Sequence, residues 1–121
     1  MRSMMQVYVK GSREAVMLYE KAFDAKLKYE YLDDDGNYFH AELDILGQVV
    51  AISESNDDES FTGNTMQFCF HFGEEYKEYV EKAYNVLSEG AQILIPLGPC
   101  SYSSQMISFI DKFGVNWCLF V

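Results

Sequence analysis

The order of predicted secondary structure occurs twice in this sequence, and this repeat constrains the fold more than any other feature. In the first half, hydrophobic periodicity predicts a strand, a helix and three further strands, at residues 4–10, 12–23, 27–32, 38–45 and 48–53. The second half predicts the same order, at residues 66–72, 74–89, 92–97, 105–110 and 115–121. Each copy is about 50 to 60 residues long, which indicates an internal structural repeat.

The two predicted helices are amphipathic, and the turns around them carry recognisable signals. The apolar face of the first consists of Ala15, Leu18, Tyr19, Ala22 and Phe23, and that of the second consists of Tyr76, Tyr79, Val80, Ala83 and Leu87. Ser12 is expected to cap the first helix and Gly90 to end the second. The Asp35-Gly36 pair predicts a hairpin between 27–32 and 38–45. Gly98-Pro99 is expected to separate the strands at 92–97 and 105–110.

A polar segment divides the two copies. Residues 56–60 are Asn, Asp, Asp, Glu and Ser, as expected of a solvated connector. We therefore predict one domain over residues 1–121, with module one at 1–55, a linker at 56–64 and module two at 65–121. The predicted fold class is α+β: two βαβββ modules form a curved mixed sheet with helices on its outer face. Its helix-free face would form a central cleft, where ligands commonly bind.

Composition excludes several classes of function. The chain of 121 residues has 9 basic and 19 acidic residues, and its formal charge of -10 disfavours nucleic acids and anionic membrane surfaces as partners. No apolar run reaches membrane-spanning length, and the first residues resemble no signal peptide, so we expect a cytoplasmic protein. The three cysteines, Cys69, Cys100 and Cys118, lack close pairing and are expected to be reduced and buried.

Three segments also resemble a known family. Residues 15–23 are similar to the first helix of the glyoxalase/bleomycin-resistance superfamily, also called the vicinal-oxygen-chelate superfamily. Residues 38–43, Tyr-Phe-His-Ala-Glu-Leu, resemble a strand of its PhnB-like branch, and residues 111–117 resemble the closing segment of that branch. Asp24 and Lys112 depart from the family pattern, in which a glycine and a proline are usual. The resemblance implies the same fold of two βαβββ modules.

The resemblance also implies where a metal ion would lie. Metal-dependent members hold a divalent ion with about four His or Glu side chains, and the matching positions here are Met4 or Met5, one of residues 51–53, Gln67 and Cys118. These residues include no histidine and no carboxylate, so they are unsuited to a hard divalent ion. We expect no metal and no other cofactor, and we do not expect the usual lactoylglutathione isomerase or extradiol dioxygenase activities.

His40 and Glu42 are the first candidate pair for the cleft. They alternate with Phe39, Ala41 and Leu43 along a predicted strand, so the two sets should face opposite sides of the sheet. The apolar set is expected under the helix. His40 and Glu42 then either form a proton-transfer pair or are polar strand residues satisfied by their neighbours.

The second module offers a similar polar set. Gln67, Cys69 and His71 alternate with three phenylalanines, and Cys118 lies on the last predicted strand. His71 could meet His40 across the cleft, although a displaced zinc site would need further ligands that the spacing does not demand. Cys118 could act as a nucleophile with His71 as its base, or simply be an inert, half-buried side chain.

Three functions remain compatible with the sequence. The first is a metal-free module that binds a small apolar or aromatic molecule. The second is a lyase or isomerase-type enzyme that uses His40 and Glu42 for acid–base chemistry, with His71 or Cys118 as further candidates. The third is a structural dimer with a vestigial cleft. In all three cases the family resemblance leads us to expect a homodimer, and the aromatic content of 16% would supply apolar surface for it.

Overall fold

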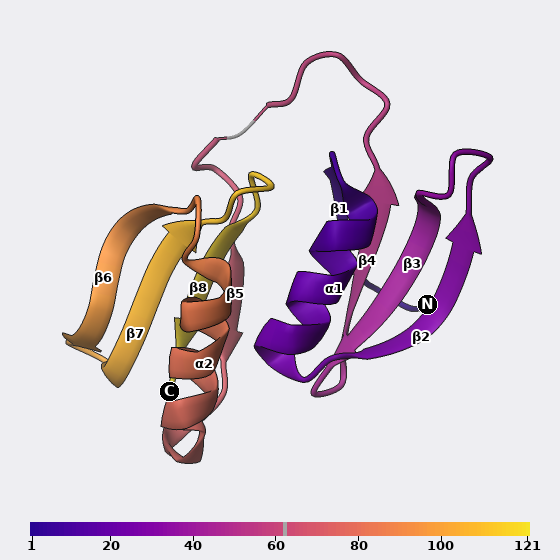
Figure 1. Ribbon diagram of the computed structural model, residues 1–121. Helices are drawn as coiled ribbons and strands as arrows, with labels where there is room; N and C mark the ends of the chain where they lie inside the picture. The colour runs from indigo at the N-terminus through magenta and orange to yellow at the C-terminus, as the bar shows by residue number, and fades with distance from the viewer. Residues whose placement is uncertain (62) are drawn as a thin grey trace. The chain divides into compact units, whose positions relative to one another are not determined.

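The structure, a computed structural model, describes residues 1–61 and 63–121. The chain forms two compact units, Met1–Ser60 and Phe61–Val121, hereafter the first and second modules (Figure 1). Each module contains one four-stranded mixed sheet and one α-helix. No helix in the described part of the chain is long and apolar enough to span a membrane.

The first module has the order strand, helix, three strands. Its elements are β1 (Met5–Val9), α1 (Ser12–Phe23), β2 (Lys26–Leu32), β3 (Tyr38–Ile45) and β4 (Gln48–Glu54). The strands are arranged β1-β4-β3-β2, with β1 parallel to β4 and the other pairs antiparallel. Each boundary lies within one residue of its predicted position, because hairpin signals separate strongly patterned segments.

The second module repeats this order. Its elements are β5 (Phe68–His71), a 3-10 turn η1 (Glu74–Tyr76), α2 (Lys77–Leu87), β6 (Gln92–Cys100), β7 (Ser103–Ile110) and β8 (Asn116–Phe120). The strand order β5-β8-β7-β6, with β5 parallel to β8, reproduces that of the first module. The predicted α+β class and the two βαβββ modules are therefore confirmed.

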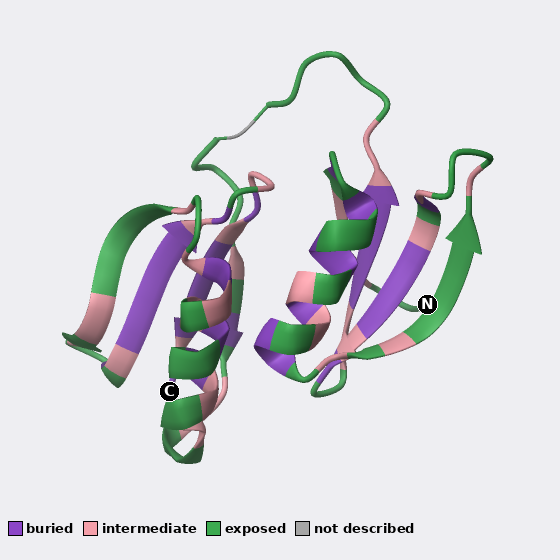
Figure 2. Cartoon of the chain, in the orientation of Figure 1, coloured by how far each residue is buried: buried purple, intermediate pink, exposed green. Residues whose placement is uncertain are grey.

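Each helix covers one face of its own sheet. Helix α1 contacts β1, β3 and β4, and α2 contacts β7 and β8. The buried residues form stripes along the central strands and the inner helix faces, coloured purple in Figure 2. Side chains without exposed surface at these contacts include Ala15, Tyr19, Leu43, Ile52, Val80, Ala83, Ile107, Phe109, Trp117 and Leu119. The predicted apolar helix faces thus supply much of both cores.

A β-bulge corrects one prediction about β3. Tyr31 pairs with His40, whereas the next residue, Leu32, pairs with Tyr38, so Phe39 has no partner on β2. An extra residue reverses the alternation of side chains beyond it. Tyr38 is consequently buried and Phe39 is 65% exposed, and the expectation that Phe39 lies under the helix is wrong. Ala41 and Leu43 are fully buried, as predicted.

The start of α1 also differs from the prediction. Gly11, in the left-handed conformation with φ 86°, occupies the cap position, and Ser12 is the first helical residue. The carboxylate of Glu54 caps the helix from the end of β4, since it accepts hydrogen bonds from the Gly11 and Ser12 N–H groups and from the Ser12 hydroxyl. Burial alone would raise the pKa of Glu54, but these hydrogen bonds lower it below the ordinary value. The capping group therefore comes from a distant strand.

Two turns of the molecule share one local structure. Asp33 and Asp111 each accept two backbone N–H groups on Oδ1, from Asp35 and Asn37 in one turn and from Phe113 and Val115 in the other. A glycine with positive φ follows each aspartate by three residues, as this tight backbone path requires. The turn at Asp111 has an additional bond, because the indole N–H of Trp117 donates to Asp111 Oδ2 at 2.9 Å.

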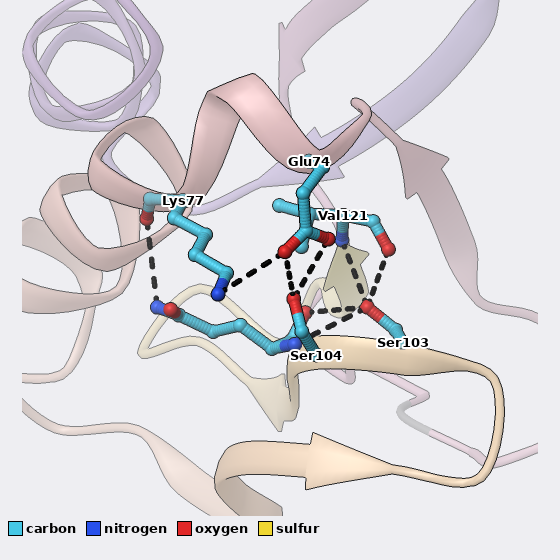
Figure 3. A network of polar contacts seen from close by, with 6 residues as sticks. Glu74, Lys77, Ser103, Ser104 and Val121 are labelled. Carbon is cyan, nitrogen blue, oxygen red and sulfur yellow. Dashed lines mark hydrogen bonds and ion pairs between the residues drawn. The ribbon is translucent and has the colours of Figure 1, made fainter.

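Polar contacts link three segments of the second module (Figure 3). The Ser103 hydroxyl donates to the carbonyl of Val121 and accepts from the Val121 N–H at 3.2 Å. Beside it, the Ser104 hydroxyl donates to Glu74, which also forms an ion pair with Lys77 at 3.1 Å. The Ser104 hydrogen bond and then Lys77 lower the pKa of the Glu74 carboxyl. The network connects η1, the start of β7 and the C-terminal residue.

The β6–β7 connection is a further correction. Strand β6 runs through Gly98-Pro99 to Cys100, and the turn comes at residues 101–102. Register shifts occur between Ile93 and Ile95, between Ile95 and Gly98 and between Gly98 and Cys100. Because β6 is an edge strand, proline and bulges are tolerated in it, and the glycine-proline pair interrupts the pairing without ending the strand.

Candidate functional site

Exposed aromatic side chains gather on the helix-free side of β2 and β3 in the first module. Tyr29 lies opposite Glu42 and Tyr31 lies opposite His40 in the antiparallel pair. Tyr29 is 52%, Tyr31 59% and Phe39 65% exposed. The rings of Tyr31 and Phe39 meet edge to face, with their centroids 5.8 Å apart. Alternation along β2 and the bulge on β3 bring these rings together.

These rings line a pocket. Its volume is about 570 Å³, and its walls are formed by Tyr29, Tyr31, Leu32, Asp33, Asp34, Phe39 and His40. All of these residues belong to β2, β3 or the turn between them, so the pocket lies within the first module. Apolar rings with a few polar groups at the edge are typical of a small-molecule site.

His40 and Glu42 are in direct contact beside the pocket. His40 Nε2 lies 3.0 Å from Glu42 Oε1. Arg2 approaches the same carboxylate with both terminal nitrogens, Nη2 at 3.0 Å from Oε1 and Nη1 at 3.2 Å from Oε2. The Tyr29 ring lies 5.9 Å from the His40 ring, between centroids. His40 is therefore held by Glu42 on one edge and bordered by an aromatic ring.

The environment of Glu42 keeps it ionised at neutral pH. The hydrogen bond from His40 and then those from Arg2 lower the pKa of Glu42, although burial opposes this effect. An anionic Glu42 favours the tautomer of His40 that carries its proton on Nε2. Nδ1 is then available as an acceptor. Glu42 thus orients His40, while its own low basicity makes it a weak proton acceptor.

The four predicted residues of the second module share one face of their sheet. Cys69 pairs with Cys118, which pairs with Ser108 on its other side. Gln67 Nε2 donates to the Ser108 hydroxyl and to Asn116 Oδ1, both at 2.9 Å. His71 stacks on Phe120 with centroids 4.6 Å apart. Since Trp117 and Leu119 on β8 are buried toward the core, this polar set lies on the opposite, helix-free side.

The surroundings of Cys118 determine its reactivity. Burial, followed by the neighbouring thiols of Cys69 and Cys100, raises the pKa of Cys118 to about 12. The side chain is consequently a neutral thiol at physiological pH, and thiolate is the nucleophilic form. The alternative in which Cys118 acts as an activated nucleophile is therefore not favoured by its environment. His71, the proposed base, stacks on the Phe120 ring instead of contacting this thiol.

The positions that the family resemblance assigns to a metal ion do not suit one here. Gln67 has its amide N–H groups engaged by Ser108 and Asn116, and Cys118 carries a neutral thiol. On β4, Ala51 lies beside Glu42 and offers no donor. No group of three or more His, Cys, Asp and Glu side chains is arranged to hold a metal ion within residues 1–61 and 63–121. The side chains at these positions are therefore poor ligands for a hard divalent ion.

Sequence reasoning missed part of this arrangement. Tyr29 and Tyr31 lie in a segment where aromatic residues favour a strand without showing which face they occupy. Arg2 precedes the first strand and carries no signal for its contact with a residue 40 positions later. Phe39 was placed on the wrong face because the bulge leaves no mark in the sequence. The alternation of Tyr29 and Tyr31 with Lys28 and Glu30 was the available signal for one aromatic face.

Comparison with known proteins identifies the fold. No protein-family model matches the sequence, and no curated protein matches it either. Among solved structures, the chain is similar to one described as a putative 3-demethylubiquinone-9 3-methyltransferase, PhnB protein, from Bacillus cereus. The TM-score is 0.81 and the sequence identity is 24%, over 99% of this chain and 98% of that chain. Protein PA1353 from Pseudomonas aeruginosa gives a TM-score of 0.81 and 21% identity over 99% and 96% of the two chains.

A further similar structure has a described ligand. It is a variant of the fosfomycin resistance protein FosX from Listeria monocytogenes, complexed with Mn(II) and 1S,2S-dihydroxypropylphosphonic acid. The TM-score is 0.69 and the identity 20%, over 99% of this chain and 88% of that chain. These likenesses extend over nearly the whole of both chains. The predicted resemblance is thus confirmed at the level of the fold, and this chain has the fold of the glyoxalase/bleomycin-resistance superfamily.

Proposed function

We propose that this chain is a PhnB-like protein of that superfamily that binds a small aromatic or apolar molecule and uses no metal ion. The observation that carries the proposal is the pocket of about 570 Å³ with three exposed aromatic rings in its wall. Its volume lies in the range of about 300 to 1,000 Å³ that is usual for small-molecule sites. The inherited metal positions, whose side chains are poor ligands, support the metal-free part of the proposal.

The exposure of these rings supports binding. Tyr29, Tyr31 and Phe39 each leave at least half of their surface in water, and they are neighbours. Contiguous apolar surface of this kind often marks a ligand or partner site. A planar molecule placed against the rings would cover apolar surface and gain aromatic contacts worth about 0.5 to 1.5 kcal/mol each. His40 would supply a polar contact that fixes its orientation.

The contact of 3.0 Å between His40 and Glu42 favours a second candidate function, which is acid–base catalysis on the bound molecule. In this alternative, His40 accepts a proton through its second ring nitrogen while Glu42 holds the ring in place. Glu42 itself would stay anionic, because His40 and Arg2 lower its pKa. The two functions differ in the fate of the ligand: a binding protein releases it unchanged, whereas an enzyme converts it.

A fluorescent probe tests the pocket. N-phenyl-1-naphthylamine is neutral and aromatic, and we expect its fluorescence to rise on binding to the wild-type protein. Tyr31→Ala and Phe39→Ala should each weaken binding by about tenfold, since the loss of one aromatic contact costs about 1.4 kcal/mol at the upper end of its usual range. Mass spectrometry of the recovered compounds, over a wider panel of aromatic molecules, would detect any conversion.

Tyr8→Ala is the matched control for this experiment. Tyr8 is 70% exposed but lies on β1, at the opposite edge of the sheet from β2, and it does not line the pocket. Its replacement should leave the affinity unchanged. Equal losses in all three variants, or no loss in Tyr31→Ala and Phe39→Ala, would contradict the proposed site.

We also propose that two copies of the chain associate. The apolar side chains Ile93, Leu94 and Ile95 on edge strand β6 are each exposed by 39% to 48%, and an exposed apolar edge favours pairing with another chain. Light scattering at micromolar concentration should then give twice the chain mass of 13.9 kDa. A mass equal to that of one chain would refute the proposed dimer.

A further inference from the structure

Two of the three cysteines lie side by side on the helix-free side of the second module, although they are far apart in the sequence. Cys69 on β5 and Cys118 on β8 are direct partners in the parallel strand pair. Cys100 lies at the end of β6, and burial together with the neighbouring thiols of Cys69 and Cys100 raises the pKa of Cys118. Cys69 is exposed, Cys100 intermediate and Cys118 buried. The expectation that all three are buried is therefore confirmed for Cys118, wrong for Cys69 and only partly met by Cys100.

We propose that Cys69 and Cys118 form a reversible disulfide by exchange with a low-molecular-weight disulfide, which makes this face a site of redox modification. Neighbouring strands lie about 4.8 Å apart, and the Cα atoms of a disulfide are usually about 4.4 to 6.8 Å apart. Side chains of strand partners also point to the same side of the sheet. The Cα spacing of the pair is therefore in the range of a disulfide, and the two thiols are neighbours on one face of the sheet.

The exposure of the two cysteines indicates which of them reacts first with the small disulfide. The exposed Cys69 thiolate attacks one sulfur of the small disulfide, whose sulfur–sulfur bond breaks, and the released thiolate takes a proton from water. The Cys118 thiol then gives its proton to water and attacks Cys69 Sγ, which releases the second small thiol. In total, two protein thiols lose two electrons and two protons, and the small disulfide gains them as two thiols.

The partner of Cys69 is Cys118 rather than Cys100. In the strand order β5-β8-β7-β6, Cys118 lies on the strand next to Cys69, whereas Cys100 lies on the far edge strand. Tyr102, in the turn that follows Cys100, packs its ring on Phe120, with the ring centroids 5.3 Å apart. Two strands, β8 and β7, thus separate Cys100 from Cys69.

The experiment uses the full chain, reduced and then treated with 2-hydroxyethyl disulfide, a neutral reagent that the acidic protein does not repel. We expect the loss of two of three thiols, the loss of two hydrogen masses and no change in oligomeric state. Digestion without reduction should yield one cross-linked pair of peptides, which contain Cys69 and Cys118. Dithiothreitol should restore all three thiols. The second step should accelerate with pH, because the raised pKa of Cys118 leaves little thiolate at neutral pH.

Variants make the assignment specific. Cys100→Ser should give the same cross-link as the wild type, and Cys118→Ser should stop with one reagent group on Cys69. Cys69→Ser replaces an exposed residue and should prevent the reaction while the fold remains intact. A stable mixed disulfide in the wild type, a cross-link through Cys100 or between chains, a disulfide that dithiothreitol leaves intact, or no reaction at all would each overturn the proposal.

Discussion

Replacement of Asp111 by alanine is expected to lower the free energy of unfolding by about 3 kcal/mol or more. The side chain is only 4% exposed and accepts hydrogen bonds from the Trp117 indole N–H and from the N–H groups of Phe113 and Val115. Each buried donor that loses its partner costs about 1 to 3 kcal/mol. Urea unfolding followed by the fluorescence of Trp117, the single tryptophan of the sequence, measures the loss directly.

The turn at Asp33 provides the matched control. Asp33 accepts two backbone N–H groups in the same geometry as Asp111, but it is more exposed and has no indole partner. Asp33→Ala should therefore cost only about 1 kcal/mol, since water replaces its bonds. Asp111→Asn should cause an intermediate loss of stability. Its amide oxygen can still accept the two backbone N–H groups, whereas its amide N–H group faces the indole N–H, and two donors form no hydrogen bond. Equal losses for Asp33→Ala and Asp111→Ala would show that burial and the indole bond contribute nothing.

Most of the fold could be predicted because periodicity and turn signals agree in this sequence. The segment at 38–45 alternates between polar and apolar residues, the segment at 48–53 contains a short apolar run, and Gly47 separates the two. Strands β3 and β4 match these segments within a residue. Helix α1 likewise buries Ala15, Tyr19 and Ala22 as its period requires. The fold class follows from the duplicated order of elements. A single βαβββ copy has a helix on only one side of its sheet, so two copies are expected to associate within one fold.

The deviations from prediction have physical causes that the local sequence does not encode. The bulge at Phe39 depends on pairing with β2, which the sequence of β3 alone does not encode. The Glu54 cap depends on the approach of a strand end to a helix start more than 40 residues away. Strand β6 tolerates Pro99 because it is an edge strand, a fact of topology rather than of composition. Contacts between distant segments thus account for each deviation.

The candidate site was predictable only in part. Period two placed His40 and Glu42 on one side of β3, and Gln67, Cys69 and His71 together on β5 or directly before it. Their contact partners, Arg2 and Phe120 among them, come from other segments. Whether the two helix-free faces share one cleft stays a prediction. Three of the seven residues that line the pocket are Tyr or Phe, and sequence reasoning assigns such large rings to the core by default.

Leu43→Ala and His40→Ala, two substitutions on one strand, are expected to have opposite consequences. Leu43 has no exposed surface and pairs with Leu27 and Val50, so its truncation leaves a cavity under α1 and should cost about 2 to 5 kcal/mol of stability. The His40 side chain is 27% exposed, and Glu42 keeps both bonds to Arg2 without it. His40→Ala should therefore change stability by less than about 1 kcal/mol.

The effect of His40→Ala should instead be seen in ligand binding. His40 lines the pocket, and the loss of its polar contact and ring surface should weaken the binding of N-phenyl-1-naphthylamine severalfold. Leu43→Ala, measured where it is still folded, should bind the probe as the wild type does, because Leu43 lies on the other side of β3. Urea unfolding and probe titration of both variants separate the two roles. If His40→Ala unfolds the protein while Leu43→Ala does not, the assignment of faces on β3 is wrong, and the proposed pocket is wrong with it.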